Sequence, residues 1–414
     1  MSSELLRADA GHRPKMVLAA ALLGWLFDGF EMGLFPVIAR PALQNLLGAP
    51  SEAAIGEWVG ILTACFLVGA ACGGFLFGWL GDKIGRVRAL SASILCYSLV
   101  TGLGYFATSP EQLASLRFVA ALGMGGEWAL GVALVMEVWS DKHRPLLAGI
   151  IGASANIGFF LVGLVARVFP VTTDSWRFML VVGVLPALLV FFIRLCVPES
   201  RRWQEAVKKT PSKPLREVFG PIYRTRTLLG IGLASVALIG TWGSVEWLPT
   251  WADQLVAGKD PDAKANTQML RSAGSLLGCL IGPLIGAAIG RRGAYALLCV
   301  VALGISAYLF RAIDSYGPMF QLFTVLMGAA STTFYGLFPL YFAELFPTRI
   351  RATGQGVCYN TGRIFAAIGA LYAGSLVASF GSYPQASAVI TLIYGAGLFL
   401  VFFAPETKGQ KLQD

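Results

Sequence analysis

The chain has 414 residues, of which 56% are hydrophobic and 13% are charged, and its formal net charge is +9. Long apolar runs in a chain of this composition exclude an ordinary soluble domain, whose core would not require them. The positive charge is divided among short segments between these runs, so we expect no nucleic-acid partner.

The apolar runs predict about twelve membrane-spanning segments. A backbone in hydrocarbon has no water to bond, so such segments must be helices, and the expected fold class is an all-α integral membrane protein. In chain order the expected spans are Met16–Ile38, Trp58–Trp79, Ala89–Phe106, Leu113–Trp139, Leu146–Val168, Phe178–Val197, Leu228–Leu248, Met269–Ile289, Ala294–Leu309, Met319–Phe342, Thr353–Val377 and Ala386–Phe403.

The second half of the chain repeats residues of the first half at a nearly fixed offset. Charged residues recur 207 residues apart, and a glycine-rich segment recurs at an offset of 208 that places Gly290 where Asp82 would align. This duplication predicts two six-helix bundles, residues 1–198 and 225–414, joined by a cytoplasmic linker at 199–224. Two similar halves in a membrane are the usual construction of a secondary transporter. The matched residues are Glu137 and Glu344, Arg144 and Arg351, Pro198-Glu199 and Pro405-Glu406, and Gly78–Gly85 and Gly286–Gly293.

Lys and Arg gather in segments that share one side of the membrane if the spans alternate. By the positive-inside rule that side is the cytoplasm, so we expect a cytoplasmic (inner) membrane protein with both termini inside and with Ser51–Glu57 and Asp253–Asp262 outside. The first apolar run is of full span length, so we interpret it as a span rather than as a cleavable signal peptide. The basic residues include Arg7, Arg13, Lys15, Lys83, Arg86, Arg88, Lys142, Arg144, Arg201, Arg202, Lys208, Lys209, Lys213, Arg216, Arg224, Arg226, Arg291, Arg292, Arg349, Arg351, Lys408 and Lys411.

Neither the cysteines nor the histidines indicate a metal site. The seven cysteines fall within or beside the spans without metal-ligand spacing, and the two histidines, His12 and His143, lie in predicted cytoplasmic segments. The sequence also lacks a Walker-type nucleotide segment. We therefore expect no cofactor, no metal and no catalytic residue, and any group that titrates inside the membrane must be a carboxylate.

The segment Gly78-Trp-Leu-Gly-Asp82-Lys-Ile-Gly85-Arg86 resembles the signature between the second and third helices of the major facilitator superfamily. The resemblance covers essentially the whole chain and implies two bundles that rock about a midplane site. Its glycines let two helix ends approach, and Asp82 can accept bonds from basic side chains or helix N-termini of the other half. We expect Asp82 and Arg86 to form a cytoplasmic latch, which should be lopsided because the second copy lacks the acid.

The repeated pairs Glu137-x6-Arg144 and Glu344-x6-Arg351 resemble the sugar-porter and metabolite-symporter branches. These branches place such charges in a cytoplasmic salt-bridge network, which implies that the two pairs gate the inner side. The alternative is that each is an ordinary exposed ion pair worth about 0–1 kcal/mol.

Three further segments resemble the metabolite:proton symporters, a group that includes sialate, lactate and aromatic-acid carriers. They are Trp25-Leu-Phe-Asp28-Gly-Phe-Glu31, Gly123-Met-Gly-Gly-Glu127-Trp128 and Tyr359-Asn360-Thr-Gly-Arg363. All three carry charges inside expected spans, where a lipid-facing charge costs at least about 2.5–3.5 kcal/mol. Such charges must therefore face a cavity or a partner.

Asp28 and Glu31 lie three residues apart on one face of the first span. Two acids this close cannot both ionise easily in a low dielectric, so one of them can carry a proton. Arg117, in the outer half of the fourth span, is the expected partner of Asp28, as the resemblance to proton-coupled sugar porters also implies. The alternatives are static, paired acids, and an Arg117 that extends to the outer surface.

Arg363, in the eleventh span, is the expected anchor for an anionic substrate, because a guanidinium can hold a carboxylate by two bonds. Its counterpart under the repeat is Asn156, and Asn360 lies three residues before it. Glu127, among glycines of the fourth span, indicates a polar cavity. The alternatives are an ion pair between Arg363 and Glu127, and a hydrogen bond from Glu127 to a neighbouring helix.

These features predict a monomeric proton-coupled symporter that takes up a small organic acid by alternating access and whose partners are the proton, the acid and the lipid bilayer. Protonation of Asp28, shared with Glu31, would release Arg117 and permit binding. A sugar or polyol symporter remains open and would have Arg363 occupied by a protein carboxylate. A drug:proton antiporter would be expected to lack a buried arginine, and a non-transporting receptor would be expected to carry an added soluble domain.

Overall fold

The computed structural model describes residues 2–48, 50–139, 142–169, 171–209, 213–256, 260, 262–372, 377, 379–410 and 412–413, without the side chains of 2–13, 52, 53, 167, 191, 194, 369 and 370. Four residues used above to predict topology and metal chemistry, Arg7, His12, Arg13 and Lys411, fall outside the side chains that it describes. The described part of the chain is helical with short connections.

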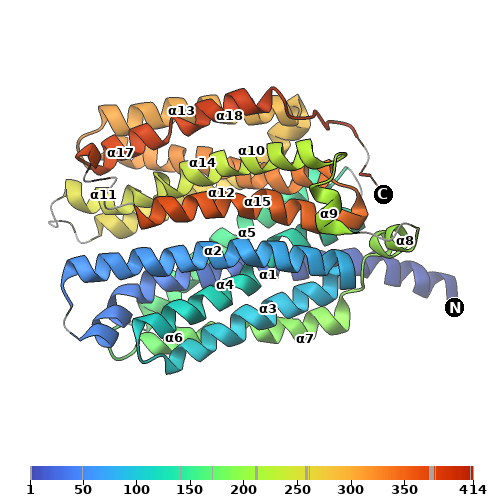
Figure 1. The fold of residues 1–414 in the computed structure, drawn as a ribbon, viewed down its shortest axis with the longest axis horizontal. Coiled ribbons are helices and arrows are strands. Elements are labelled where there is room, and N and C mark those ends of the chain that lie inside the picture. Colours follow the sequence, from blue (N-terminus) through green and yellow to red (C-terminus); the bar gives the residue numbers. More distant parts are fainter. Residues whose placement is uncertain are drawn as a thin grey trace.

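The first half of the chain forms the lower layer of Figure 1 and the second half forms the upper layer. The first half contains α1 (Ser2–Leu47), α2 (Glu52–Ile84), α3 (Arg86–Leu103), η1 (Gly104–Phe106), α4 (Pro110–Val138), α5 (Arg144–Val168), α6 (Trp176–Val182) and α7 (Pro186–Cys196). The second half contains α10 (Arg224–Trp242), η2 (Val245–Trp247), α11 (Leu248–Leu255), α12 (Ala263–Ile289), α13 (Arg291–Ala312), α14 (Pro318–Leu345), η3 (Thr348–Ile350), α15 (Arg351–Leu371), α17 (Tyr383–Ile390) and α18 (Ile393–Val401). Two short helices, α8 (Arg201–Lys209) and α9 (Pro214–Val218), lie in the expected linker.

Ten of the described helical segments are long and apolar enough to cross a membrane. The predicted sixth and twelfth spans are each broken in two, as α6 with α7 and α17 with α18. Pro186 begins α7, where its missing N–H is tolerated, and so marks the first of these breaks. The predicted eleventh span is α15, whose Gln355, Asn360 and Arg363 lower its hydropathy. The arrangement agrees with the predicted number of about twelve spans.

Close packing between spans depends on glycine in both halves. A Cβ on Gly125 of α4 would lie 1.8 Å from the carbonyl oxygen of Ala70 on α2. In the second half, a Cβ on Gly336 of α14 would lie 2.1 Å from the carbonyl oxygen of Cys279 on α12. Backbones can come this close only where a side chain is absent, which is the usual way in which membrane helices gain packing contacts.

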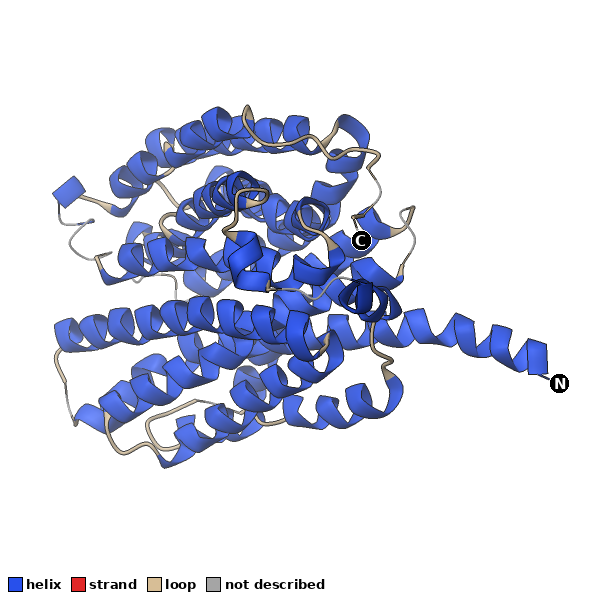
Figure 2. Cartoon of the chain, turned by 45° about the vertical axis from the view of Figure 1, so that its right-hand side comes forward, coloured by secondary structure: helices blue, strands red, loops and turns tan. Residues whose placement is uncertain are grey.

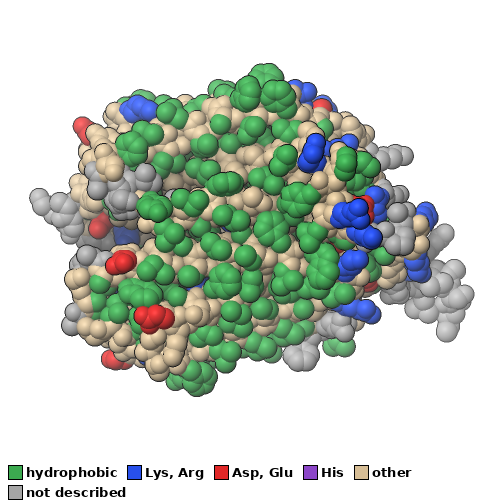
Figure 3. Space-filling model, viewed as in Figure 1, with side chains coloured by type: hydrophobic (Ala, Val, Ile, Leu, Met, Phe, Trp, Pro, Cys, Tyr) green, Lys and Arg blue, Asp and Glu red, His purple; other side chains and the backbone are tan. Residues whose placement is uncertain are grey.

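The two ends of the molecule carry opposite charge. Figure 3 shows most of its visible Lys and Arg at the end that also carries α8 and the chain termini, and α1 extends beyond the other helices there (Figure 2). We call this the basic end, and it includes the exposed residues Lys83, Arg88, Lys208, Lys209 and Arg216. We call the opposite end the acidic end, and it includes the exposed residues Glu57, Glu111, Asp174, Asp253 and Asp262.

The repeat is aligned differently from the sequence prediction at the α2–α3 turn. Gly85 and Gly290 form the equivalent turns, with φ of 109° and 90°, so the local offset is 205 residues. A positive φ is a conformation that glycine adopts at little cost, which fixes these two positions as counterparts. The residue that corresponds to Asp82 is therefore Ala287 and not Gly290. The second copy still lacks the acid.

Adding a methyl group at Gly125 should separate α2 from α4. We expect Gly125→Ala to destabilise the protein by about 1–3 kcal/mol, because the new Cβ meets backbone that cannot move aside. Gly163→Ala on α5 is the control, since nothing lies within 4 Å of a Cβ at that position. Thermal unfolding of the purified Gly125→Ala and Gly163→Ala variants in detergent measures the stability of each. Equal unfolding temperatures would contradict the packing argument.

Candidate functional site

Most buried charges of the described chain, with the charged groups that contact them, fall into two groups, and Arg271, which pairs with Glu246, lies outside both. We call the first the central group, which lies along the middle of the helices and comprises Asp28, Glu31, Arg117, Glu127 and Arg363. We call the second the basic-end network, which comprises the buried residues Asp82, Arg86, Glu137, Arg144, Arg291, Glu344 and Arg351, the half-buried Glu199 and the exposed Glu406.

Glu31 and Arg117 form an ion pair within the central group. Arg117 Nη1 lies 3.0 Å from Glu31 Oε1, and Thr101 Oγ1 donates to the same oxygen at 2.9 Å. The guanidinium carbon lies 4.8 Å from the ring centre of Phe35 and 4.6 Å from that of Phe66. Arg117 is therefore held by one acid and two aromatic rings, and its 9% side-chain exposure does not fit an extension to the surface.

The predicted pairing of Arg117 with Asp28 is wrong. Helix α1 runs from the basic end towards the acidic end, and α4 begins at the acidic end. Glu31 lies about 4.5 Å further along α1 than Asp28, at a rise of about 1.5 Å per residue, and so reaches the level of Arg117 near the start of α4. Sequence spacing showed that the two acids share a face but not which of them is level with Arg117.

Asp28 is fully buried, and neither of its carboxylate oxygens has a hydrogen bond within the described structure. The groups that interact with it electrostatically include Arg363 from α15, Glu31 from its own helix and Glu127 from α4. Asp28 can therefore gain or lose a proton without breaking a direct ion pair. The arginine that acts on it belongs to the other half of the molecule.

Glu127 is also buried, and both of its carboxyl oxygens are without a hydrogen bond in the described part of the chain. Its Oε1 lies 2.2 Å from the point that a Cβ on Gly24 of α1 would occupy. Glu127 also lines a small cavity with room for about one water molecule. The other residues that line it are Ala21, Trp25, Leu90, Trp128, Gly131, Val132 and Ile151.

Arg363 is 4% exposed, and its Nη1 donates to Asn360 Oδ1 at 3.0 Å. Its guanidinium carbon lies 5.1 Å from the ring centre of Tyr359, which stacks on Trp128 of α4 at 4.4 Å. The hydrogen bond recorded for Arg363 thus goes to a neutral amide rather than to a carboxylate. The expected alternative pair of Arg363 with Glu127 is not among the ion pairs of the described residues.

The two predicted amide ligands are placed differently. Asn360 Nδ2 donates to the carbonyl oxygens of Gly125 at 3.3 Å and Gly356 at 2.9 Å, so this amide joins α15 to α4 and supports Arg363. Asn156 lies on α5 near Cys279 of α12. The stack of Trp128 on Tyr359 was not predicted. Both residues stood inside the quoted motifs, which is the signal that could have identified them.

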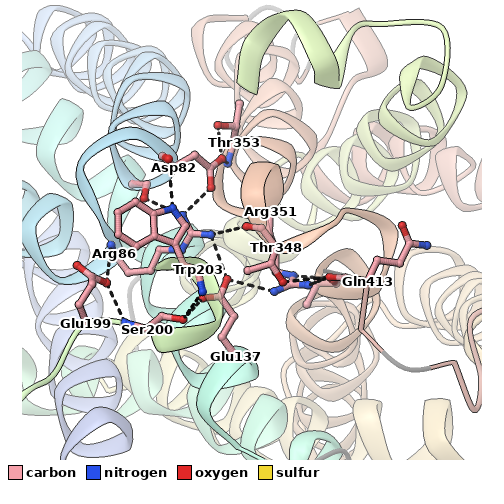
Figure 4. Close-up of polar contacts among 12 residues, drawn as sticks. Asp82, Arg86, Glu137, Glu199, Ser200, Trp203, Thr348, Arg351, Thr353 and Gln413 are labelled. Atoms are coloured by element: carbon pink, nitrogen blue, oxygen red, sulfur yellow. Dashed lines mark hydrogen bonds and ion pairs between the residues drawn. The ribbon is translucent and has the colours of Figure 1, made fainter. Parts of the chain in front are cut away.

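Arg86 and Asp82 lie at the centre of the basic-end network (Figure 4). Arg86 Nη1 donates to Asp82 Oδ1 at 2.6 Å, and Nη2 donates to the Thr348 carbonyl of the other half at 2.6 Å. Asp82 Oδ2 accepts bonds from the backbone N–H and the hydroxyl of Thr353, at 2.8 and 2.5 Å. Thr353 lies in the first turn of α15, so the expected bond from Asp82 to a helix N-terminus across the halves is present.

The glutamates of the network bind arginines differently from the sequence pairing. Glu137 Oε1 accepts from Arg86 at 3.0 Å and from Arg351 of the other half at 3.1 Å. Glu344 accepts from Arg291 at 2.6 Å and is acted on electrostatically by Arg144 of the other half. Arg144 is acted on electrostatically by both Glu344 and Glu137. The recorded bonds of the two glutamates therefore include one partner in the same half, and Glu137 also bonds across to Arg351.

The chain after α18 adds backbone acceptors to the same interface. Arg351 Nη2 donates to the Gln413 carbonyl at 2.9 Å, and Arg202 of α8 donates to the Leu412 carbonyl at 2.6 Å. Thr348 also binds the Gln413 carbonyl, through its backbone N–H at 3.1 Å. A segment near residue 412 therefore contacts both the linker helix α8 and the start of α15.

Glu199 and Glu406 occupy equivalent positions but titrate differently. Burial raises the pKa of Glu199 above its usual value of 4.5, although backbone N–H groups of Ser200, Val87 and Arg86 oppose this shift. Glu406 is less buried, and its burial is outweighed by four backbone N–H donors, which lower the pKa of Glu406 below 4.5. These donors belong to Arg291, Lys408, Arg292 and Thr407.

Comparison with known proteins gives a consistent relationship. The family model described as the Major Facilitator Superfamily matches residues 20–311, and the one described as Sugar (and other) transporter matches residues 239–409. The chain is 30% identical over 411 residues to the probable 4-methylmuconolactone transporter of Cupriavidus pinatubonensis, covering 97% of this chain and 92% of the relative. It is 29% identical over 398 residues to the cis,cis-muconate transport protein of Acinetobacter baylyi, covering 92% of each.

A solved structure shares the fold. The proton:xylose symporter bound to 6-bromo-6-deoxy-D-glucose superposes with a TM-score of 0.81 at 19% identity, covering 97% of this chain and 98% of the other. At this identity the likeness concerns the fold alone. The relatives by sequence and by structure are transporters rather than enzymes.

Breaking the bond between Glu137 and Arg351 should open the interface at the basic end. Removing one partner of a buried ion pair costs about 3–5 kcal/mol, so we expect Glu137→Gln to shift the balance between closed and open forms by at least about tenfold. Spin labels on Arg88→Cys and Gly293→Cys, in a background without the native cysteines, measure the distance between the halves. Glu205→Gln on the surface of α8 is the matched control, and identical distance distributions in the two variants would refute the role of the pair.

The stability effects of Glu199 and Glu406 should depend on pH in opposite directions. The folded pKa of Glu406 is lowered, so its carboxylate stabilises the fold above the unfolded pKa, and this contribution is lost as the pH falls through the folded value. The folded pKa of Glu199 is raised, so its contribution is present below the unfolded pKa and is lost as the pH rises through the folded value.

Thermal unfolding across a pH series checks this opposition. Towards acidic pH, the unfolding temperature of wild type should fall relative to that of Glu406→Gln and should rise relative to that of Glu199→Gln. Parallel trends for the two variants would show that the backbone donors do not distinguish the two sites.

Proposed function

We propose that this protein is a proton-coupled symporter for a small organic acid. The chain belongs to the Major Facilitator Superfamily and crosses the membrane many times. The family carries small molecules across membranes, and the relatives named above carry metabolites. We propose that the protein lies in the inner membrane and works as a monomer. We place its basic end in the cytoplasm, because the positive-inside rule favours that orientation.

The observation that carries this proposal is that Arg363 is buried without a bond to a carboxylate among the described residues. It is a buried cation whose recorded hydrogen bond goes to a neutral amide, and it lies beside an aromatic stack that joins the two halves. A guanidinium has five N–H donors in a planar fork that matches a carboxylate by two bonds. A flat acid can place its carboxylate on Arg363 and its unsaturated body against Tyr359 and Trp128.

Asp28 is the group that we assign to proton coupling. When Asp28 is ionised, its charge compensates that of Arg363 across the interface, and an anionic substrate would add a second, uncompensated negative charge. When Asp28 is protonated, Arg363 is free to compensate the substrate instead. The released arginine is therefore Arg363 rather than Arg117, which remains paired with Glu31.

The basic-end network supplies the second part of the cycle. Its contacts between Asp82 and Thr353 and between Glu137 and Arg351 hold the two halves together on the side that we place in the cytoplasm. We propose that these contacts break when the loaded carrier turns inward, and that proton and acid leave on that side. The carrier then returns empty with Asp28 again compensating Arg363.

A sugar or polyol symporter is the second candidate, favoured by the match to the sugar-transporter model and by the fold of the xylose symporter. A neutral substrate would need no free cation, so Arg363 would be expected in an ion pair with a protein carboxylate. Its recorded bond to Asn360 supports the acid instead.

Proton uptake into liposomes that contain the purified protein and an internal pH dye tests the proposal. We expect proton entry with monocarboxylates, cis,cis-muconate or aromatic acids, and a loss of at least about tenfold in Arg363→Gln, because a charge-assisted bidentate contact is removed. Asp28→Asn should abolish the coupled proton entry. A response to hexoses alone that survives Arg363→Gln would move the assignment to the sugar symporter, and a response to lipophilic cations would move it to an antiporter.

A further inference from the structure

Glu127 is a buried acid that the proposed exchange between Asp28 and Arg363 does not use. It is 2% exposed, and neither carboxyl oxygen has a hydrogen bond within the described structure. Its Oε1 stands against the backbone of α1 at Gly24, where even a Cβ would not fit. The carboxyl group is thus held against α1, beside the cavity that has room for about one water molecule.

The groups that face Glu127 include an acid and a phenol. Asp28 from α1 acts on Glu127 electrostatically, and Tyr97 from α3 brings its phenol close to the Glu127 carboxyl group without a geometric hydrogen bond. On the side of α2, the neighbouring Gly126 meets the apolar ring of Phe77.

The arginines of the central group are directed at other partners. Arg117, on the same helix as Glu127, is bonded to Glu31. Arg363 from α15 acts on Asp28 and on Tyr359, whose ring stacks on Trp128. Each cation of the central group is therefore matched with an acid other than Glu127.

An ionised carboxylate in this place would be costly. A buried charge without a cation or a hydrogen bond is strongly disfavoured in a low dielectric, whereas a neutral carboxylic acid is tolerated. Because Glu31 is paired with Arg117, the central group has two other acids, Asp28 and Glu127, and one other arginine, Arg363. Charge balance is reached when one of them is ionised, and Asp28 is the one that lies near Arg363.

We propose that Glu127 keeps its proton throughout the transport cycle and donates it in a hydrogen bond to the substrate. This inference rests on the proposed function and adds a second recognition point to it. Arg363 holds the carboxylate, and the neutral acid Glu127 binds a second polar acceptor, a carbonyl oxygen or a ring nitrogen, at the other side of a flat molecule. Only Asp28 then exchanges its proton, so one proton accompanies one monocarboxylate and no net charge moves.

Infrared difference spectroscopy of the protein in liposomes tests the protonation directly. The wild type should show a carbonyl-stretch band of a protonated carboxylic acid that is absent in Glu127→Gln, persists in Asp28→Asn and persists in alkaline buffer. The matched control is Glu205→Gln, at an exposed glutamate of α8, which should leave the band in place. Absence of the Glu127 band at neutral pH would overturn the proposal.

Two probe acids test the hydrogen bond to the substrate. Nicotinate and benzoate share a ring and a carboxylate, and only nicotinate has a ring nitrogen that can accept the bond. We expect Glu127→Leu to raise the half-saturation concentration for nicotinate about 3- to 10-fold, the value of one hydrogen bond, and to change that for benzoate less. Glu127→Gln, which keeps an N–H donor, should recover part of the loss.

The outcomes separate this inference from the proposed function. Equal effects of Glu127→Leu on both acids, or uptake that a membrane potential accelerates because net charge moves, would overturn the donor role. If neither acid drives proton uptake in wild type, the proposed function fails for aromatic acids. The infrared band then still upholds or overturns the protonation of Glu127.

Discussion

The absence of water in the hydrocarbon is the constraint on which this structure depends, because each buried charge must find its partner within the protein. Glu137 satisfies this requirement with two arginines and a serine hydroxyl, and Glu31 satisfies it with Arg117 and a threonine. Removing a partner from an acid that is bonded to an arginine in this way costs stability, and such pairs therefore hold the protein in one arrangement. Asp28 has no such bonds, and a proton can neutralise it without disrupting the packing around it.

The duplication of the chain explains how the contacts between the two halves can depend on charge. Each half supplies the same glutamate and arginine, yet the bond from Arg351 to Glu137 and the influence of Arg144 on Glu344 both cross between the halves. Pairs within one half would stabilise each bundle and leave the interface unaffected. Crossed pairs make the relative position of the bundles depend on charge. The acid at Asp82, replaced by Ala287 in the second copy, adds a further contact on one side only.

The sequence was sufficient for the spans, the duplication and the contact of Asp82 with the other half, because hydropathy and repeated motifs are local properties of the chain. It was not sufficient for pairing. The spacing of Asp28 and Glu31 shows a shared helix face, but the choice of Glu31 by Arg117 depends on the level at which α1 and α4 meet. The crossing of Arg351 to Glu137 depends in the same way on the contact between two bundles. A short motif does not encode how α1 lies against α4 or how one bundle lies against the other.

In the proposed mechanism, coupling between proton and substrate follows from the number of charges in the central group rather than from a relay of moving side chains. With Glu31 and Arg117 paired, and with Glu127 neutral as proposed, the remaining balance is between Arg363 and a single negative charge. Ionised Asp28 and a bound carboxylate are alternatives for that position, since both together would leave one negative charge uncompensated in a low dielectric. Under this proposal, an anion is held only after a proton has reached Asp28. Because the loaded and the empty sites carry the same net charge, neither state is penalised when the two halves close around it.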